Sequence, residues 1–169
     1  LLVAAMNPCP CGYYGSRVKN CRCNQAQIER YLSRLSGPLI DRIDLHVEVA
    51  DQPPEELRAR RRSGDDSATL LGRVKLARAR QEKRFKGTPY RSNGELRGEG
   101  VEKHCRVAGS CEKLLMDGMR ELGLSARAYH KVLVISRTLA DLEDGAEIAE
   151  QHVAEALNYR LLDQKYFNG

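Results

Sequence analysis

The sequence contains no Trp, and its aromatic residues are seven Tyr and two Phe, or 5% of the chain. No apolar run approaches the 18 or so residues that a membrane-spanning helix needs, so we expect no membrane partner and a cytoplasmic protein. Hydrophobic residues nevertheless make up 41% and charged residues 30%. This composition excludes collagen-like, low-complexity and fully disordered chains.

A phosphate loop of the form G-x-x-x-x-G-K-[ST] is also missing, as is an acidic strand end that could hold Mg²⁺. We therefore expect these 169 residues alone not to hydrolyse ATP. Leu1–Met6 is a continuous apolar run ending at Asn-Pro, which is typical of a buried parallel strand. Because such a strand needs neighbours on both sides, we expect the chain to be a fragment of a longer protein.

The first part of the chain, residues 1–50, mixes predicted strands with a helix. After the strand Leu1–Met6 comes a Cys- and Gly-rich loop, residues 7–23, and then a helix, Gln25–Leu35, with Asn24 as its N-cap. Ile43–Val49 alternates apolar and polar residues, which predicts a second strand.

The remainder of the chain is predicted to be helical. Residues 51–69 form a highly charged linker, and residues 70–169 form an all-helical domain. Ser125 is the expected N-cap of one of its helices, and Asp144-Gly145 the expected end of that helix. The predicted helices are Leu70–Phe85, Cys111–Leu122, Ser125–Leu142 and Ile148–Leu162.

Four of the six cysteines share the loop and form the pattern C-x-C, nine residues, C-x-C; they are Cys9, Cys11, Cys21 and Cys23. Four soft thiolates suit tetrahedral Zn²⁺, and the metal would order a loop too small to have its own core. Zinc is the leading prediction; free thiols and a redox pair are the alternatives. Cys105 and Cys111 occur with His104 but have no evident fourth ligand, so we expect the two thiols to pack between helices.

Three polar residues occupy positions where a nucleotide could be contacted. Asn7 follows a predicted strand, Arg42 precedes one, and Arg127 opens a helix. An amide at a strand end can orient water, and a guanidinium group can stabilise charge on a transferred phosphoryl group. Each residue also has a simpler interpretation: Asn-Pro starts turns, Arg42 could pair with Asp41 or Asp44, and Arg127 could be solvated.

These residues lie in three stretches: AAMNPCPCGYYG, CRCNQAQIERYLSRLSGPLIDRIDLHVEV and LSARAYHKVLVISRTLADL. In their residues and in their order along the chain, these stretches resemble the ComM/YifB-type magnesium-chelatase-like AAA+ ATPases of bacteria. The resemblance implies the α/β edge of an AAA+ P-loop core followed by an all-α lid domain. It also implies that Asn7 is sensor 1, Arg42 an arginine finger acting in trans, and Arg127 sensor 2.

The family resemblance further implies ATP and Mg²⁺ bound by the full-length protein, with the phosphate loop upstream of Leu1. It implies self-association into a ring, expected to be a hexamer, and DNA as partner, with branch migration in recombination or transformation as the role. Insertion of magnesium into a porphyrin is an alternative role for the same family.

A different class of function also fits the composition. Lys and Arg total 28 against 23 Asp and Glu, giving a net charge of +5. A zinc-stabilised DNA-binding module without enzymatic activity could use the Arg-rich segments Glu55–Arg62 and Arg73–Arg84 to contact phosphates. A mildly basic, solvated surface is the simplest interpretation of the same charge.

Overall fold

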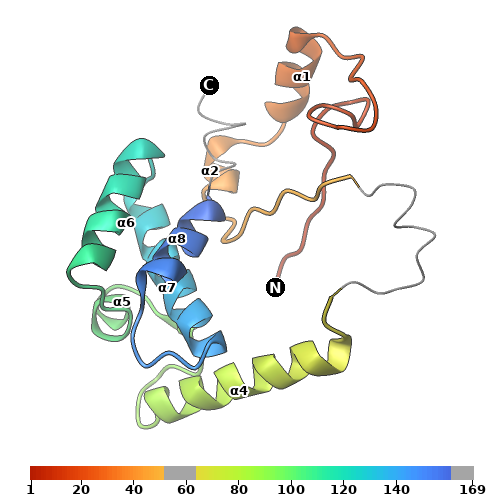
Figure 1. The fold of residues 1–169 in the computed structure, drawn as a ribbon. Helices are drawn as coiled ribbons and strands as arrows, with labels where there is room; N and C mark the ends of the chain where they lie inside the picture. Colours follow the sequence, from red (N-terminus) through yellow and green to blue (C-terminus); the bar gives the residue numbers. More distant parts are fainter. Residues whose placement is uncertain (52–63, 161–169) are drawn as a thin grey trace. The chain divides into compact units, whose positions relative to one another are not determined.

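The computed structural model describes residues 1–51 and 64–160 (Figure 1). The chain divides between residues 63 and 64 into two compact units. The first described range belongs to the first unit and the second range to the second unit. Residues 52–63, which include most of the predicted linker and the segment Glu55–Arg62, lie outside the described residues.

The first unit contains α1 (Gln25–Leu32) and the short α2 (Gly37–Ile40). The predicted cap of α1 is confirmed: the Asn24 side chain accepts from the Gln27 backbone N–H at 2.9 Å, and the Gln27 side chain accepts from that of Asn24 at 3.0 Å. The helix ends three residues before the predicted Leu35. Ser36 then caps α2 by accepting from the Leu39 N–H at 3.3 Å.

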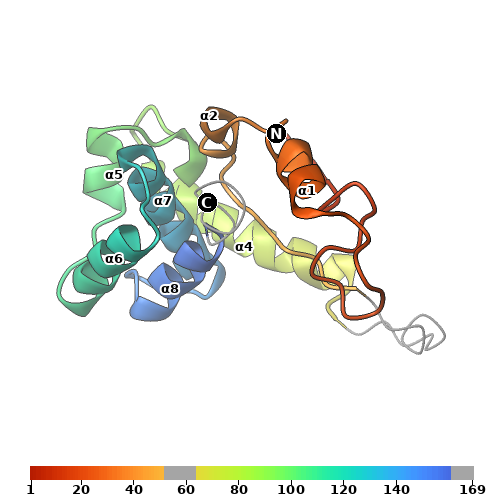
Figure 2. The same ribbon diagram turned by 90° about the horizontal axis from the view of Figure 1, so that it is seen from above.

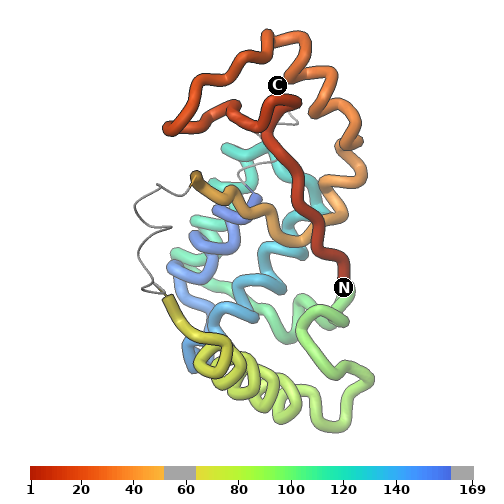
Figure 3. The backbone as a smooth tube through the Cα atoms, turned by 90° about the vertical axis from the view of Figure 1, so that its right-hand side faces the viewer, coloured from red at the N-terminus to blue at the C-terminus, as the bar shows by residue number. Residues whose placement is uncertain are grey.

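The two predicted strands, Leu1–Met6 and Ile43–Val49, are corrected by the structure, which assigns no strand within residues 1–51 or 64–160. The tube in Figure 3 shows the N-terminal segment running away from the Cys loop as a drawn-out chain. A strand exists only where it pairs with another, and the described residues contain no such ladder. Apolar side chains in both segments are consequently exposed, including Val3 at 84% and Val49 at 86%.

The second unit is helical, as predicted (Figure 2). Helix α7 packs against α4, α5 and α8, and α6 packs against α8. Its elements are α4 (Ser67–Phe85), the 3-10 turn η1 (Asn93–Glu95), α5 (Glu99–His104), α6 (Ser110–Glu121), α7 (Ala126–Leu142) and α8 (Glu150–Asn158). None of the described helices is both long and apolar enough to cross a membrane.

The ends of these helices follow local chemistry. Ser125 caps α7, as predicted, by accepting from the Ala128 N–H at 3.1 Å, and Asp144 ends that segment with a left-handed φ of 65°. Helix α4 begins three residues before the predicted Leu70, because Asp66 accepts from the Thr69 N–H at 2.7 Å. Helix α5 was not predicted, and α8 begins at Glu150 rather than at Ile148.

The apolar core of the second unit lies between α5, α6, α7 and α8. Helices α6 and α8 approach closely at Gly118, where a Cβ would lie 2.5 Å from Cδ1 of Leu157. A larger residue at this position would push the two helices apart or force Leu157 out of its place. Fully buried members of the core include Leu115, Val132, Val153 and Ala156.

A buried carboxylate joins α4 and η1 to α7. Asp141 is fully buried, and Arg84 donates to both of its carboxylate oxygens. Asn93 Nδ2 donates to Asp141 Oδ2 at 2.8 Å, and Arg137 Nη2 lies 3.2 Å from Oδ1. Arg137 also donates to the carbonyl oxygens of Gly145 and Ala146, at 2.6 and 2.9 Å. The negative charge of Asp141 therefore balances the positive charges of two guanidinium groups, the partly buried Arg84 and the buried Arg137.

We expect Asp141→Asn to lower the free energy of unfolding by about 3–5 kcal/mol, because removing one partner leaves the guanidinium groups of Arg84 and Arg137 without a counter-ion. Urea unfolding followed by circular dichroism measures this. Asp117→Asn is the matched control: Asp117 pairs with Arg120 at 3.1 Å on the surface of α6, where such a pair contributes about 0–1 kcal/mol. Equal effects of the two substitutions would contradict the account.

The same carboxylate predicts a pH dependence. Desolvation pushes the pKa of Asp141 up, but hydrogen bonds from Arg84 and Asn93 outweigh it and hold the pKa below its usual value. A carboxyl group whose pKa is lower in the folded state stabilises the fold at pH values above its unfolded-state pKa, which is about 4. This stabilisation is lost as the pH falls through the folded-state pKa. We therefore expect the free energy of unfolding, measured from pH 7 to pH 2, to fall more steeply below pH 4 in the unsubstituted chain than in Asp141→Asn. Parallel pH profiles of the two proteins would exclude this mechanism.

Candidate functional site

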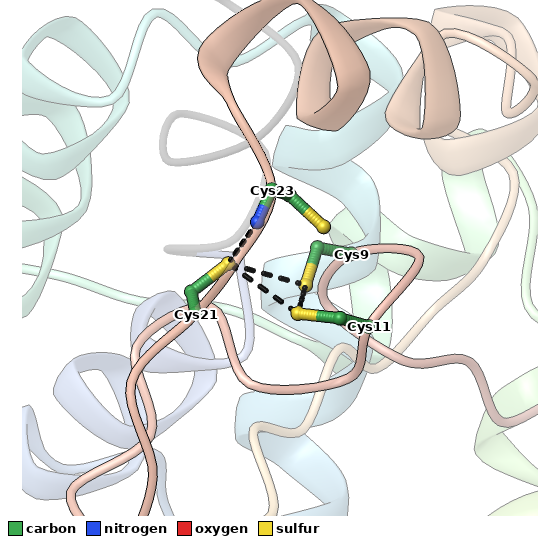
Figure 4. Close-up of side chains that lie close together, drawn as sticks. All are labelled: Cys9, Cys11, Cys21 and Cys23. Carbon is green, nitrogen blue, oxygen red and sulfur yellow. Dashed lines mark hydrogen bonds between the residues drawn. The ribbon is translucent and has the colours of Figure 1, made fainter.

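The four loop cysteines converge, as their spacing predicts (Figure 4). The Sγ atom of Cys9 lies 3.4 Å from that of Cys11 and 3.7 Å from that of Cys21, and Cys11 and Cys21 are 3.5 Å apart. All four sulfur atoms, including that of Cys23, lie within 4.8 Å of one another. All four are free thiols, so no disulfide accounts for the cluster.

The separations fit a single tetrahedral ion. With zinc–sulfur bonds of about 2.3 Å, the edge of the sulfur tetrahedron is about 3.8 Å long. The closest sulfur atoms here, 3.4 to 3.7 Å apart, are near that length. Four thiolates would complete the coordination and leave no open position for substrate, which is typical of a structural site. The cluster can hold a metal ion such as zinc.

The backbone of the loop brings the pairs of thiols together. Gly12 adopts a φ of +82° directly after Cys11, and its N–H donates to the Cys9 carbonyl at 3.0 Å, which closes a tight turn. In the second pair, the Cys23 backbone N–H donates to Cys21 Sγ at 3.4 Å. Cys23 is followed at once by Asn24, the cap of α1, so the loop leads directly into the helix.

The thiols differ in acidity. Backbone N–H groups of Arg22 and Tyr13 lower the pKa of Cys11 to about 6. For Cys21, the Cys23 backbone N–H lowers the pKa, but desolvation and the neighbouring thiols Cys11 and Cys9 raise it to about 12. The Cys11 thiol thus ionises more readily than the Cys21 thiol, and binding of a cation would release the protons that the thiols still carry.

The other two cysteines belong to the core of the second unit. Cys105 and Cys111 are buried, and Cys111 Sγ lies 3.6 Å from the Ile148 carbonyl oxygen. Desolvation is the largest influence on Cys105 and raises the pKa of its thiol to about 12. Both residues pack in the helical core of the second unit, as predicted.

The residues predicted to contact a nucleotide all lie on the surface of their own units. Asn7 sits two residues before Cys9, and its amide lies 3.9 Å from the position that a Cβ on Gly12 would occupy. Arg42 follows α2, and its Nη1 donates to the Pro38 carbonyl at 2.8 Å. This carbonyl was not among the expected partners of Arg42. The position of the Asn7 amide near Gly12 was not predicted either.

Arg127 lies in the first turn of α7, directly after the Ser125 cap. It is exposed on the second unit, whereas Asn7 and Arg42 belong to the first. The structure thus brings Asn7 together with the thiol cluster and places Arg42 and Arg127 on separate elements. Their predicted roles as arginine finger and sensor 2 stay predictions.

Comparison with known families accounts for most of this chain. The family described as "Magnesium chelatase, subunit ChlI C-terminal" matches residues 64–160, and "Magnesium chelatase, subunit ChlI" matches residues 1–57. The chain belongs to the magnesium chelatase subunit ChlI family. The gap between the two matches includes the division between the two units at residues 63 and 64.

Individual relatives lead to the same family. The competence protein ComM of Haemophilus influenzae is 40% identical over 161 residues, 95% of this chain and 30% of the relative. The uncharacterized protein YifB of Salmonella typhimurium is 40% identical over 163 residues, 96% of this chain and 31% of the relative. An uncharacterized protein of Mycobacterium bovis is 33% identical over 162 residues. The chain thus spans about a third of the length of these relatives.

Proposed function

We propose that this chain is part of an ATP-driven, ring-forming AAA+ motor that acts on DNA in the cytoplasm, in recombination or transformation. The observation that carries the proposal is the order of Asn7, Arg42 and Arg127 along the chain. All three are exposed, Arg42 just after α2 and Arg127 in the first turn of α7. The 40% identity to a competence protein supports a role in transformation. ATP and Mg²⁺ would be bound largely by parts of the longer protein outside these residues.

In this proposal the two arginines act on the same nucleotide from different subunits. Arg42 reaches a neighbouring subunit's ATP, which requires its guanidinium group to leave the Pro38 carbonyl to which it donates at 2.8 Å. Arg127 contacts the nucleotide of its own subunit when the helical unit closes as a lid. Asn7 orients the attacking water or a phosphate oxygen.

Zinc is the metal that we propose for the thiol cluster. Cys9, Cys11, Cys21 and Cys23 would hold it, and its thiolate bonds would cross-link the loop. Among the described residues of the first unit, the buried side chains are Cys9, Ile28 and Ile40, so little apolar packing is available to order it. The chemistry of zinc here is structural, because four thiolates leave it no position for a reactant.

The alternative of a non-enzymatic DNA-binding module receives less support from α4. Its arginines make contacts within the protein: Arg73 pairs with Asp65 at 3.2 Å, Arg80 pairs with Asp144, and Arg84 pairs with Asp141. An arginine that is already paired with a carboxylate attracts a DNA phosphate less strongly. The two proposals separate experimentally, since a module would bind DNA as this chain alone, with an affinity that falls steeply with salt.

The family description equally supports a metal-insertion role, as a magnesium-chelatase-type ATPase subunit. The residues proposed to act on ATP would be the same in that case. What differs is the substrate that the ring acts on, so stimulation of the full-length protein's ATPase by branched DNA distinguishes the two roles.

Protein purified without added metal should contain about one zinc per chain, because the four thiols are prearranged at separations that fit one ion. Elemental analysis measures this. Cys21→Ser should lose most of the zinc, whereas Cys105→Ser, which changes a buried thiol of the second unit, should keep it. Chelation should increase amide hydrogen exchange in residues 1–51 and leave α7 protected. Metal-free protein with an equally protected loop would contradict the proposal.

In the full-length protein, Arg42→Ala should reduce ATP turnover by about 10³-fold or more with little change in nucleotide binding, as for other arginine fingers. Arg127→Ala should reduce ATP turnover and, in addition, weaken nucleotide binding. Arg34→Ala and Arg120→Ala, which remove exposed arginines of the same two units, are the matched controls and should leave turnover unchanged.

A mixture of subunits tests whether Arg42 acts in trans. Rings that combine Arg42→Ala subunits with subunits lacking the phosphate-loop Lys contain some interfaces where an intact loop faces an intact Arg42. Activity should therefore partly return on mixing. Absence of rescue in verified mixed rings would count against the assignment, and unchanged turnover in Arg42→Ala alone would exclude it.

A further inference from the structure

We infer that the four-thiol loop is the positioning element of Asn7, so that metal occupancy sets the orientation of the Asn7 amide. The inference rests on the proposed zinc site and gives it a role in the nucleotide site. Its evidence is the position of the Asn7 side chain, which within the first unit lies near the turn that joins Cys9 to Cys11.

The backbone of Asn7 is restricted on its C-terminal side. Pro8 follows it, and the residue before a proline is held in extended conformations by the proline ring. Only Pro8 separates Asn7 from Cys9, whose side chain is fully buried within the cluster. The main chain of Asn7 is thus attached, through one stiff residue, to a candidate metal ligand.

The side chain of Asn7 lies near the same turn. Its Cγ and Nδ2 atoms are each 3.9 Å from the position of a Cβ on Gly12, the residue after Cys11. Within the part of the chain that the structure describes, no hydrogen bond fixes this amide. The turn beside this amide, in which Gly12 has a φ of +82° and donates to the Cys9 carbonyl, is therefore the element that we infer to position it.

That turn has little else to stabilise it. Within residues 1–27 the one buried residue is Cys9, and the other buried residues of the first unit, Ile28 and Ile40, lie on α1 and α2. Without metal, the sulfur atoms are held by contacts of 3.4 to 3.7 Å between the thiols. Metal–thiolate bonds would replace these weak contacts and fix the Cys9–Cys11 turn, and with it the backbone beside the Asn7 amide.

Nuclear magnetic resonance of the 169-residue chain tests the inference directly. The Asn7 side-chain NH₂ signals, assigned by their loss in Asn7→Ala, should show nuclear Overhauser effects to the Gly12 α protons when zinc is bound. These effects should vanish on chelation. Asn93 is the internal control, because its Nδ2 donates to Thr138 and Asp141 in the second unit, and its signals should not change.

Two glycine variants make the test specific. Gly12 and Gly15 have nearly the same φ, +82° and +79°, but a Cβ on Gly15 would have nothing within 4 Å. Asn is among the residues that tolerate this conformation best, so Gly12→Asn and Gly15→Asn carry similar strain. Both should bind zinc, but only Gly12→Asn should shift the Asn7 signals of the loaded chain.

The outcomes separate the inference from the metal proposal. If zinc binds and the Asn7 signals are the same with and without it, the positioning role is wrong and the zinc site stands. If both glycine variants leave the Asn7 signals unchanged, the positioning role is also wrong. If the chain takes up no zinc, the zinc proposal fails, and the positioning role fails with it.

Discussion

The convergence of four thiol groups is the interaction on which the first unit depends. Cys9, Cys11, Cys21 and Cys23 gather their sulfur atoms within 4.8 Å in a region where Ile28 and Ile40 are the other buried side chains described. Burying one such side chain contributes about 1.5–3 kcal/mol, whereas structural zinc in zinc-finger peptides binds with about 10–16 kcal/mol. Metal binding would therefore determine whether the loop, the start of α1 and the turn near Asn7 hold one conformation.

The second unit is stabilised differently. Its helices enclose an apolar core, and the fully buried Asp141 joins α4 and η1 to α7 through Arg84, Asn93 and Arg137. An ion network of this kind adds little net free energy over apolar packing but penalises any arrangement that leaves its cations unpaired. Loss of metal should thus affect the two units unequally.

The sequence predicted features whose chemistry is local and missed those that depend on distant partners. Asn24 and Ser125 cap their helices through residues three positions away, and the thiol cluster follows from cysteine spacing. The strands failed because pairing requires a second segment, which the described residues do not supply. The partnership of Arg84 with Asp141 spans 57 positions, so no periodicity could indicate it. Helix α5 is six residues long and lacks a side-chain cap, which left it without a signal.

X-ray absorption at the zinc edge tests the central claim most directly, because it reports the atoms bonded to the metal. The account predicts one zinc per chain, surrounded by four sulfur atoms at about 2.3 Å and by no lighter ligand. A coordination shell containing nitrogen or oxygen, or fewer than four sulfur atoms, would contradict a closed four-thiolate site. Absence of zinc from protein prepared under reducing conditions would contradict it completely.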